Sequence, residues 1–128
     1  MKTGLKRVGK YIFLFTVSVV ILVITATYFY KSYQKNRSYS LHYLGMEEKK
    51  AGDYLKAIKL LSMSIEAYPK DYVPYLTLAS CFEELGNIDL AVEEYETAYK
   101  LIENSDDKIA LHDLKLLKYK LRKLKKVY

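Results

Sequence analysis

GDYLKAIKLLSMSIEAYP, residues 52–69, contains the pattern from which the fold of the chain can be predicted. Gly52 and Asp53 predict a tight turn and then a helix, because the Asp53 carboxylate can accept an amide hydrogen of the first helical turn. Apolar and small side chains then recur at every third or fourth position, which is typical of one face of an amphipathic helix. These side chains are Ala57, Ile58, Leu61, Ser64 and Ile65. Pro69 predicts the end of the helix, because proline cannot continue one.

The same pattern returns 34 residues later without an insertion. Gly52 aligns with Gly86, and the other aligned pairs are Leu41 with Tyr75, Leu44 with Leu78, Gly45 with Ala79, Ala57 with Ala91, Leu61 with Tyr95, Ser64 with Ala98 and Ile65 with Tyr99. Small side chains at these positions predict helices that cross closely. We expect four larger ones, Leu44, Leu61, Leu78 and Tyr95, to fill the space between the helices.

This register resembles the tetratricopeptide repeat, which has a period of 34 residues. The first copy contains Leu41-x-x-Leu44-Gly45-x-x-Glu48, Ala57-x-x-x-Leu61 and Pro69, and the second contains Tyr75-x-x-Leu78-Ala79-x-x-Phe82 and Ala91-x-x-x-Tyr95. The departures are Glu48 at an aromatic position and Glu103 in place of the second proline. The resemblance covers about half of the chain and implies an all-α fold, with repeat 1 at residues 38–71 and repeat 2 at residues 72–105. The alternative is an ordinary helical-hairpin bundle with accidental similarity.

Within the repeats we expect helices near residues 39–51, 54–68, 72–85 and 88–102, the third capped by Asp71. A last helix, near residues 106–126, would be capped within residues 104–107 and would place Ala110, Leu114, Leu117, Leu121 and Leu124 on one stripe. We predict that residues 106–128 form a basic capping helix that covers the last apolar surface of the array. The alternative is that four cations of this helix contact anionic lipid headgroups or an acidic partner. These cations are Lys118, Arg122, Lys125 and Lys126.

Residues 11–30, YIFLFTVSVVILVITATYFY, contain no charged side chain. As a helix they would span roughly 30 Å, which is the thickness of the hydrocarbon core of a bilayer. Lys10 and Lys31 flank them, and tyrosines near both ends suit the membrane interfaces. We therefore predict a transmembrane helix between a basic tail at residues 1–10 and a juxtamembrane segment at residues 31–37. A cleaved signal peptide is the alternative, although its apolar part would be shorter, about 7 to 15 residues.

The basic residues of the tail, Lys2, Lys6, Arg7 and Lys10, favour an N-terminus in the cytoplasm and repeats on the far side of the membrane. In a bacterium this means an inner-membrane protein with an extracytoplasmic repeat domain; the alternative is a mitochondrial outer membrane with the repeats in the cytosol. No proline or glycine lies between Tyr11 and Gly45, so the anchor can continue as one helix into the first repeat. The alternative is a new helix capped by Ser38 or Ser40.

The sequence offers no pattern that is typical of catalysis or metal binding. His42 and His112 are isolated, and no glycine-rich phosphate loop or Gly-x-Ser-x-Gly motif occurs. The single cysteine, Cys81, excludes an internal disulfide, and we expect it to be a buried structural thiol. The formal net charge of +6 is uneven, because repeat 2 is acidic, so it does not favour nucleic-acid binding. We expect no enzyme activity, cofactor, metal or small-molecule substrate.

In tetratricopeptide repeats the first helix of each pair lines a concave groove that holds a peptide. The resemblance places Tyr39, His42, Tyr43, Met46 and Lys50 of repeat 1 and Val73, Leu76, Ser80, Glu83 and Glu84 of repeat 2 in this groove. His42 and Met46 occupy positions where some members carry a lysine and an asparagine that clamp a peptide carboxylate, so we do not expect that mode. The apolar and aromatic lining favours an amphipathic helix or a partner subunit. The alternative for Tyr39 and Tyr43 is simple packing against the neighbouring helix.

These features together predict a single-pass membrane-anchored adaptor that holds a partner protein in a membrane complex. The first alternative is an import or secretion receptor, similar to the mitochondrial receptors that bind amphipathic targeting helices. The second is an accessory subunit of an enzyme or of an envelope-remodelling machine. Two repeats are few for a continuous core, so we expect a bound partner to supply the missing contact.

Overall fold

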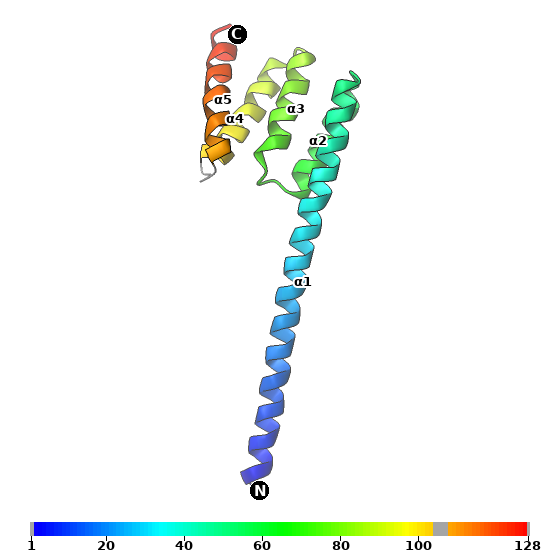
Figure 1. Ribbon diagram of the computed structural model, residues 1–128, viewed down its shortest axis with the longest axis vertical. Helices are drawn as coiled ribbons and strands as arrows, with labels where there is room; N and C mark the ends of the chain where they lie inside the picture. Colours follow the sequence, from blue (N-terminus) through cyan, green and yellow to red (C-terminus); the bar gives the residue numbers. More distant parts are fainter. Residues whose placement is uncertain (1, 104–107, 128) are drawn as a thin grey trace. The chain divides into compact units, whose positions relative to one another are not determined.

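The computed structural model describes residues 2–103 and 108–127, with side chains described for residues 7–103 and 112–126. These residues form five α-helices and no strand (Figure 1), which confirms the expected all-α fold. The helices are α1 (Lys2–Lys50), α2 (Tyr54–Ala67), α3 (Tyr72–Glu84), α4 (Ile88–Glu103) and α5 (Lys108–Val127). The expected cap within residues 104–107 and the side chain of Ala110 lie outside the described part. The chain divides into two compact units, residues 1–34 and 35–128.

The first unit is a stretch of α1 whose side chains are open to the surroundings. Large apolar residues along it are exposed, among them Phe15 (70%), Leu22 (67%) and Phe29 (77%). It is the one helix in the described residues that is long and apolar enough to cross a membrane, and nothing in the structure covers its most apolar stretch.

α1 continues without a break to Lys50, so the alternative start at Ser38 or Ser40 is wrong. Neither serine caps a new helix. The Ser40 hydroxyl donates to the Asn36 carbonyl 3.2 Å away, inside the helix. Ser38 is buried and its hydroxyl lies 2.9 Å from that of Ser64 in α2.

The turns and helix caps in residues 51–103 are formed by aspartates and glycines next to the helix ends. Asp53 Oδ1 accepts the amide hydrogen of Lys56 at 3.1 Å, and Asp71 Oδ1 accepts that of Val73 at 3.0 Å. Gly52 and Gly86 adopt φ values of +83° and +77°, the left-handed region that glycine enters without a steric penalty. As a result α2, α3 and α4 begin and end within two residues of the predicted positions.

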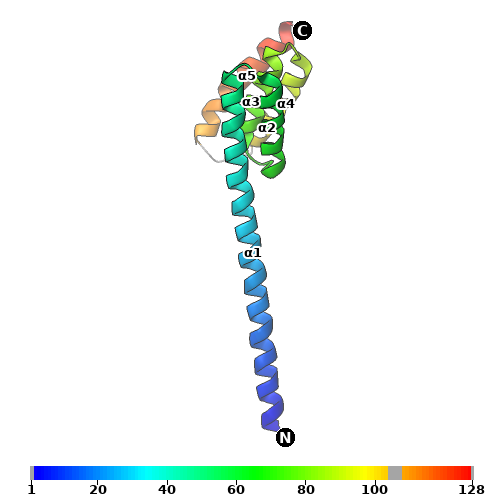
Figure 2. The same cartoon turned by 90° about the vertical axis from the view of Figure 1, so that its right-hand side faces the viewer.

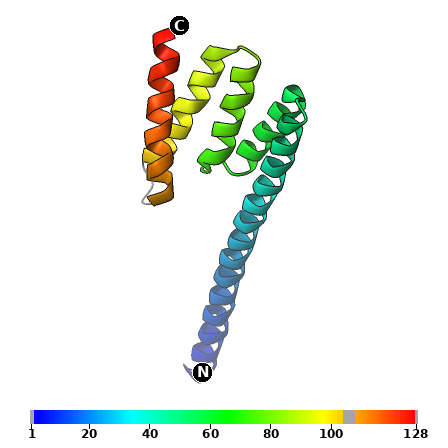
Figure 3. The same cartoon turned by 45° about the horizontal axis from the view of Figure 1, so that its top comes forward.

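The second unit is a succession of helices in which each contacts the next, α2 with α3, α3 with α4 and α4 with α5 (Figures 2 and 3). One core cluster joins α2 to α3 through Ala57, Leu61, Leu78 and Cys81. A second joins α3, α4 and α5 through Ala79, Ala91, Tyr95, Ala98, Ile102 and Leu117. Leu114, Leu121 and Leu124 of α5 pack against this second cluster, as expected of a helix that covers the end of an array.

Small residues mark the helix crossings. Ala57, Ala79, Ala91, Ala98 and Ser64 are all fully buried. The Ser64 hydroxyl also donates to the Ser38 carbonyl at 2.8 Å, which satisfies a polar side chain inside the core. The predicted close crossings are confirmed at these positions.

The prediction that Leu44 fills the space between helices is wrong, because its side chain is 50% exposed. Its counterpart Leu78 packs with Ala57 and Leu61, which belong to the preceding helix pair. Leu44 sits in the first pair, and no earlier pair exists in the described residues to cover it. Glu48 occupies an aromatic position of the repeat pattern, and its carboxylate forms an ion pair with Lys56 of α2.

Candidate partner-binding surface

The predicted groove residues come from two stretches, the end of α1 and α3, which two side-chain hydrogen bonds join. His42 Nε2 lies 3.1 Å from the Thr77 hydroxyl, and Lys49 Nζ donates to the Ser80 hydroxyl at 2.7 Å. Burial lowers the pKa of His42, although the Asp71 carboxylate acts in the opposite direction. The imidazole is therefore neutral near pH 7. His42 and Ser80 thus serve to hold the two helices together.

The apolar residues of the predicted groove are open to solvent. Tyr39, Tyr43 and Met46 of α1 are 47%, 63% and 37% exposed, and Val73 of α3 is 36% exposed. Lys35 Nζ lies 5.6 Å from the centre of the Tyr39 ring and 6.0 Å from that of Tyr68, within reach of a cation–π contact. The exposure of Tyr43 shows that this ring is not a packing residue within the described part of the chain.

Two charged members of the predicted groove, Lys50 and Glu84, are also exposed. Lys50 Nζ lies 2.8 Å from Glu47 Oε1 one turn earlier in α1. This pair is well solvated, so it adds little to stability and leaves Lys50 available to a partner.

The remaining acid of the predicted groove, Glu83, is engaged inside the protein. Lys120 Nζ of α5 lies 2.8 Å from Glu83 Oε2, and the Tyr95 hydroxyl of α4 donates to the same oxygen at 3.0 Å. The Lys120 ammonium also stands 4.7 Å from the centre of the Tyr95 ring. Burial alone would raise the pKa of Glu83, but the bonds from Lys120 and Tyr95 outweigh burial and keep this pKa below its usual value. Glu83 thus links three helices.

A cavity of about 320 Å³ brings two predicted residues, Leu76 and Ser80, together with residues of α4 and α5. The others that line it are Tyr95, Asp113, Leu116, Leu117 and Lys120. Asp113 Oδ2 accepts a hydrogen bond from the Tyr72 hydroxyl at 3.0 Å. Sequence reasoning missed this contribution of α5, because it considered the helix as a cap and considered only its cations Lys118, Arg122, Lys125 and Lys126 for contact with lipid or an acidic partner. The available signal was the position of α5 directly after two helix pairs, where the first helix of a third pair would stand.

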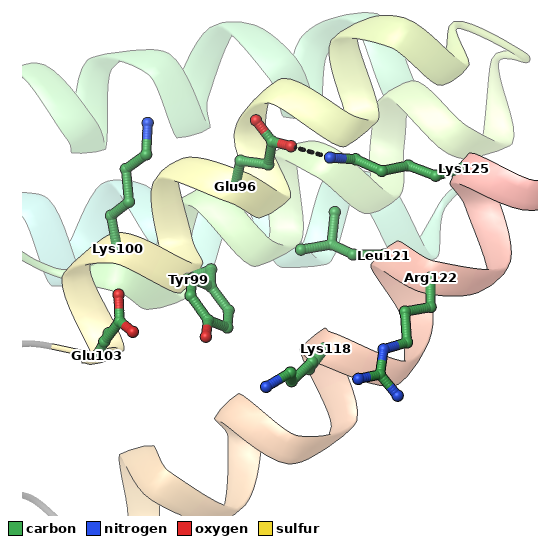
Figure 4. A pocket seen from close by; sticks show the side chains of 8 residues that line it. All are labelled: Glu96, Tyr99, Lys100, Glu103, Lys118, Leu121, Arg122 and Lys125. Atoms are coloured by element: carbon green, nitrogen blue, oxygen red, sulfur yellow. Dashed lines mark hydrogen bonds and ion pairs between the residues drawn. The ribbon is translucent and has the colours of Figure 1, made fainter.

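A larger cavity, about 490 Å³, lies between α4 and α5 (Figure 4). It includes three of the four cations that were predicted to contact an anionic surface, Lys118, Arg122 and Lys125. The fourth, Lys126, is exposed and does not line the cavity. Lys125 is not fully available, because its ammonium forms an ion pair with Glu96.

The described residues contain no group of three or more His, Cys, Asp or Glu side chains placed to hold a metal ion. The Cys81 thiol is buried, and burial raises its pKa, although the nearby Lys49 acts in the opposite direction. A thiol with a raised pKa is a poor nucleophile at neutral pH. Its position in the α2–α3 cluster gives it a packing role.

Comparisons with known proteins add a likeness to solved structures. No family model matches the chain, and no curated protein matches it either. Among solved structures, the chain is similar to the first TPR of Spaghetti (RPAP3), a structure bound to the HSP90 peptide SRMEEVD. The two are 18% identical with a TM-score of 0.47, over 69% of this chain and 95% of the other. The repeat assignment therefore depends on the chain's own 34-residue register and on the packing of its helices.

Proposed function

We propose that this chain is a single-pass membrane-anchored adaptor, whose helical-repeat unit holds a partner protein at the membrane. The observation that carries the proposal is the uncharged stretch at residues 11–30, a helix whose large apolar side chains are exposed and covered by nothing in the described structure. Apolar surface of this extent on a water-soluble helix would be unfavourable, and a bilayer removes it from water.

Three threonine hydroxyl groups within this stretch fit a lipid environment. Thr16, Thr25 and Thr27 each donate to the carbonyl three residues earlier, at 2.8 to 2.9 Å. A polar group in the hydrocarbon core must find its hydrogen bonds inside the protein, and these hydroxyls do so within their own helix. The basic N-terminal tail supports a cytoplasmic N-terminus, and in a bacterium this places the repeat unit outside the cytoplasm.

The adaptor surface that we propose consists of the exposed apolar residues Tyr39, Tyr43 and Met46 of α1 and Val73 of α3. Leu76 of α3 completes it and is partly buried against the core. The neighbouring polar side chains His42 and Ser80 are already hydrogen-bonded. A partner therefore meets mainly apolar and aromatic groups, which favours an amphipathic helix over a charged tail. The receptor for basic targeting helices is not proposed, because Glu83 and Glu96 are already paired with lysines of α5.

The test is capture of partners from detergent-solubilised membranes by the tagged full chain. Tyr43→Ala and Leu76→Ala should each deplete the same captured protein, while Tyr119→Ala, which removes a 71% exposed tyrosine of α5, should retain it. Circular dichroism of each purified variant checks that the helices are intact. A captured set that is unchanged in both groove variants would overturn the proposed surface.

A further inference from the structure

We propose that the cavity between α4 and α5 is a second docking site, which takes an acidic amphipathic helix of a partner protein. This site goes beyond the surface on α1 and α3 and shares no residue with it. The cavity has an apolar floor and a basic rim on α5, and its rim on α4 carries two glutamates, Glu96 and Glu103, and one lysine, Lys100 (Figure 4).

The floor consists of Tyr99 of α4 and Leu121 of α5, both partly exposed at the bottom of the groove. Their apolar surfaces remain uncovered although they pack against the core on their inner side. The volume of about 490 Å³ is enough to accept apolar side chains from a ligand. Covering this floor would remove apolar surface from water, which supplies a driving force for docking.

The basic rim carries charge that the described residues do not neutralise. Residues 112–126 of α5 contain seven lysines and arginines and one acid, Asp113. Lys120 and Lys125 are paired with Glu83 and Glu96. Lys118 and Arg122 border the cavity, are exposed and have no acidic partner within the described residues. Carboxylates of a ligand placed beside these two cations would be electrostatically complementary.

The same arrangement favours a protein segment over a flat anionic bilayer. The α4 side of the groove carries Glu96, which is paired with Lys125, together with Glu103 and Lys100, so it gives a uniformly negative surface no net attraction (Figure 4). The apolar stripe of α5, including Leu117 and Leu124, packs against α4 and cannot insert into lipid without leaving the core. A helix can place its acids toward α5 and its apolar side chains over Tyr99 and Leu121, so that only one of its edges meets the glutamates.

The experiment uses the full chain in micelles of a zwitterionic detergent and a fluorescent helical peptide about five turns long. The peptide carries leucines at i, i+4 spacing and glutamates along one edge, and its counterpart carries lysines in place of the glutamates. The double variant Lys118→Glu/Arg122→Glu should bind the acidic peptide at least about tenfold more weakly, because repulsion replaces attraction. The matched control Lys115→Glu/Lys123→Glu changes the same charge at exposed positions of α5 outside the cavity and should lose less than about threefold.

Three results would overturn the proposed site. The first is that the acidic peptide does not bind, and the second is that the basic peptide binds equally well. The third is that both double variants lose the same affinity for the acidic peptide, which would indicate diffuse attraction to α5. Binding of vesicles of phosphatidylcholine and phosphatidylglycerol that depends on Lys118 and Arg122, without peptide binding, would assign the rim to lipid. Tyr43→Ala and Leu76→Ala should leave peptide binding unchanged, so this test can fail while the proposed adaptor surface stands.

Discussion

Gly45 of α1 lies so close to Leu61 of α2 that a Cβ atom on Gly45 would stand 2.8 Å from Leu61 Cγ and 3.0 Å from its Cδ2. Leu61 is fully buried and cannot move outward. The glycine is therefore required by the approach of the second helix, and not by its own backbone, which is helical.

Gly45→Ala should lower the free energy of unfolding by about 1 kcal/mol. Overpacking costs about 1–3 kcal/mol, and the better helix propensity of alanine returns about 0.5–1 kcal/mol. Thermal unfolding followed by circular dichroism measures the change. Gly9→Ala is the control, because a Cβ atom there meets nothing within 4 Å. Equal or greater stability of Gly45→Ala would show that the two helices are not in tight contact.

The register predicts that Ala57 and Ala91 play equivalent parts in the two helix pairs. Both are fully buried, so Ala57→Leu and Ala91→Leu should each destabilise the protein by about 1–3 kcal/mol. Leu55→Ala removes a leucine that is 73% exposed and should change stability by no more than about 0.5 kcal/mol. Chemical denaturation measures the free energy of unfolding of all three variants. If either alanine accepts leucine at no cost, the repeat equivalence is wrong.

His42 should make stability depend on pH. Burial holds its pKa in the folded state below the value of about 6.5 that it has when unfolded. The unfolded chain therefore binds a proton more readily, and the contribution of His42, complete above about pH 6.5, is lost as pH falls through the folded pKa. Melting temperatures between about pH 7.5 and pH 5 should fall less steeply for His42→Gln than for the wild type.

His112→Gln is the matched control for this experiment, because His112 is exposed on α5. It should keep the wild-type dependence on pH. An identical dependence in wild type and His42→Gln would mean that the imidazole is already solvated in the folded state, contrary to its bond with Thr77.

The ion pair between Glu83 and Lys120 should couple α3 to α5. A double-mutant cycle with Glu83→Gln and Lys120→Met should give a coupling energy on the order of 1 kcal/mol, the upper part of the range for partly exposed pairs. The exposed pair Glu47–Lys50 within α1 supplies the comparison and should give a smaller coupling energy, because solvent screens it. Chemical denaturation measures both cycles. A coupling for Glu83–Lys120 no larger than that of the surface pair would remove its role in fixing α5.

Local features of this fold could be predicted from the sequence, because their causes lie within a few residues. Asp53 and Asp71 cap the helices that follow them, and Gly52 and Gly86 supply the left-handed turns. The small residues at the crossings could also be predicted, since a close approach of two helices leaves room for little else.

Features that depend on distant neighbours could not be predicted in the same way. Leu44 keeps the register of Leu78, but a register does not tell whether a preceding helix exists to bury the side chain. Glu83 was predicted to face a ligand, and it faces Lys120 of α5 instead. The capping position of α5 could be predicted, but not which of its side chains reaches α3. The α4–α5 cavity escaped prediction for the same reason.

Alkaline carbonate extraction of membranes from cells that express the full chain tests whether residues 11–30 form a membrane anchor. We expect the chain to remain in the membrane pellet. Ile21→Arg, near the middle of the stretch, costs about 3–4 kcal/mol of insertion free energy and should shift part of the chain out of the pellet. Recovery of the unmodified chain in the carbonate supernatant would show that residues 11–30 do not span the membrane.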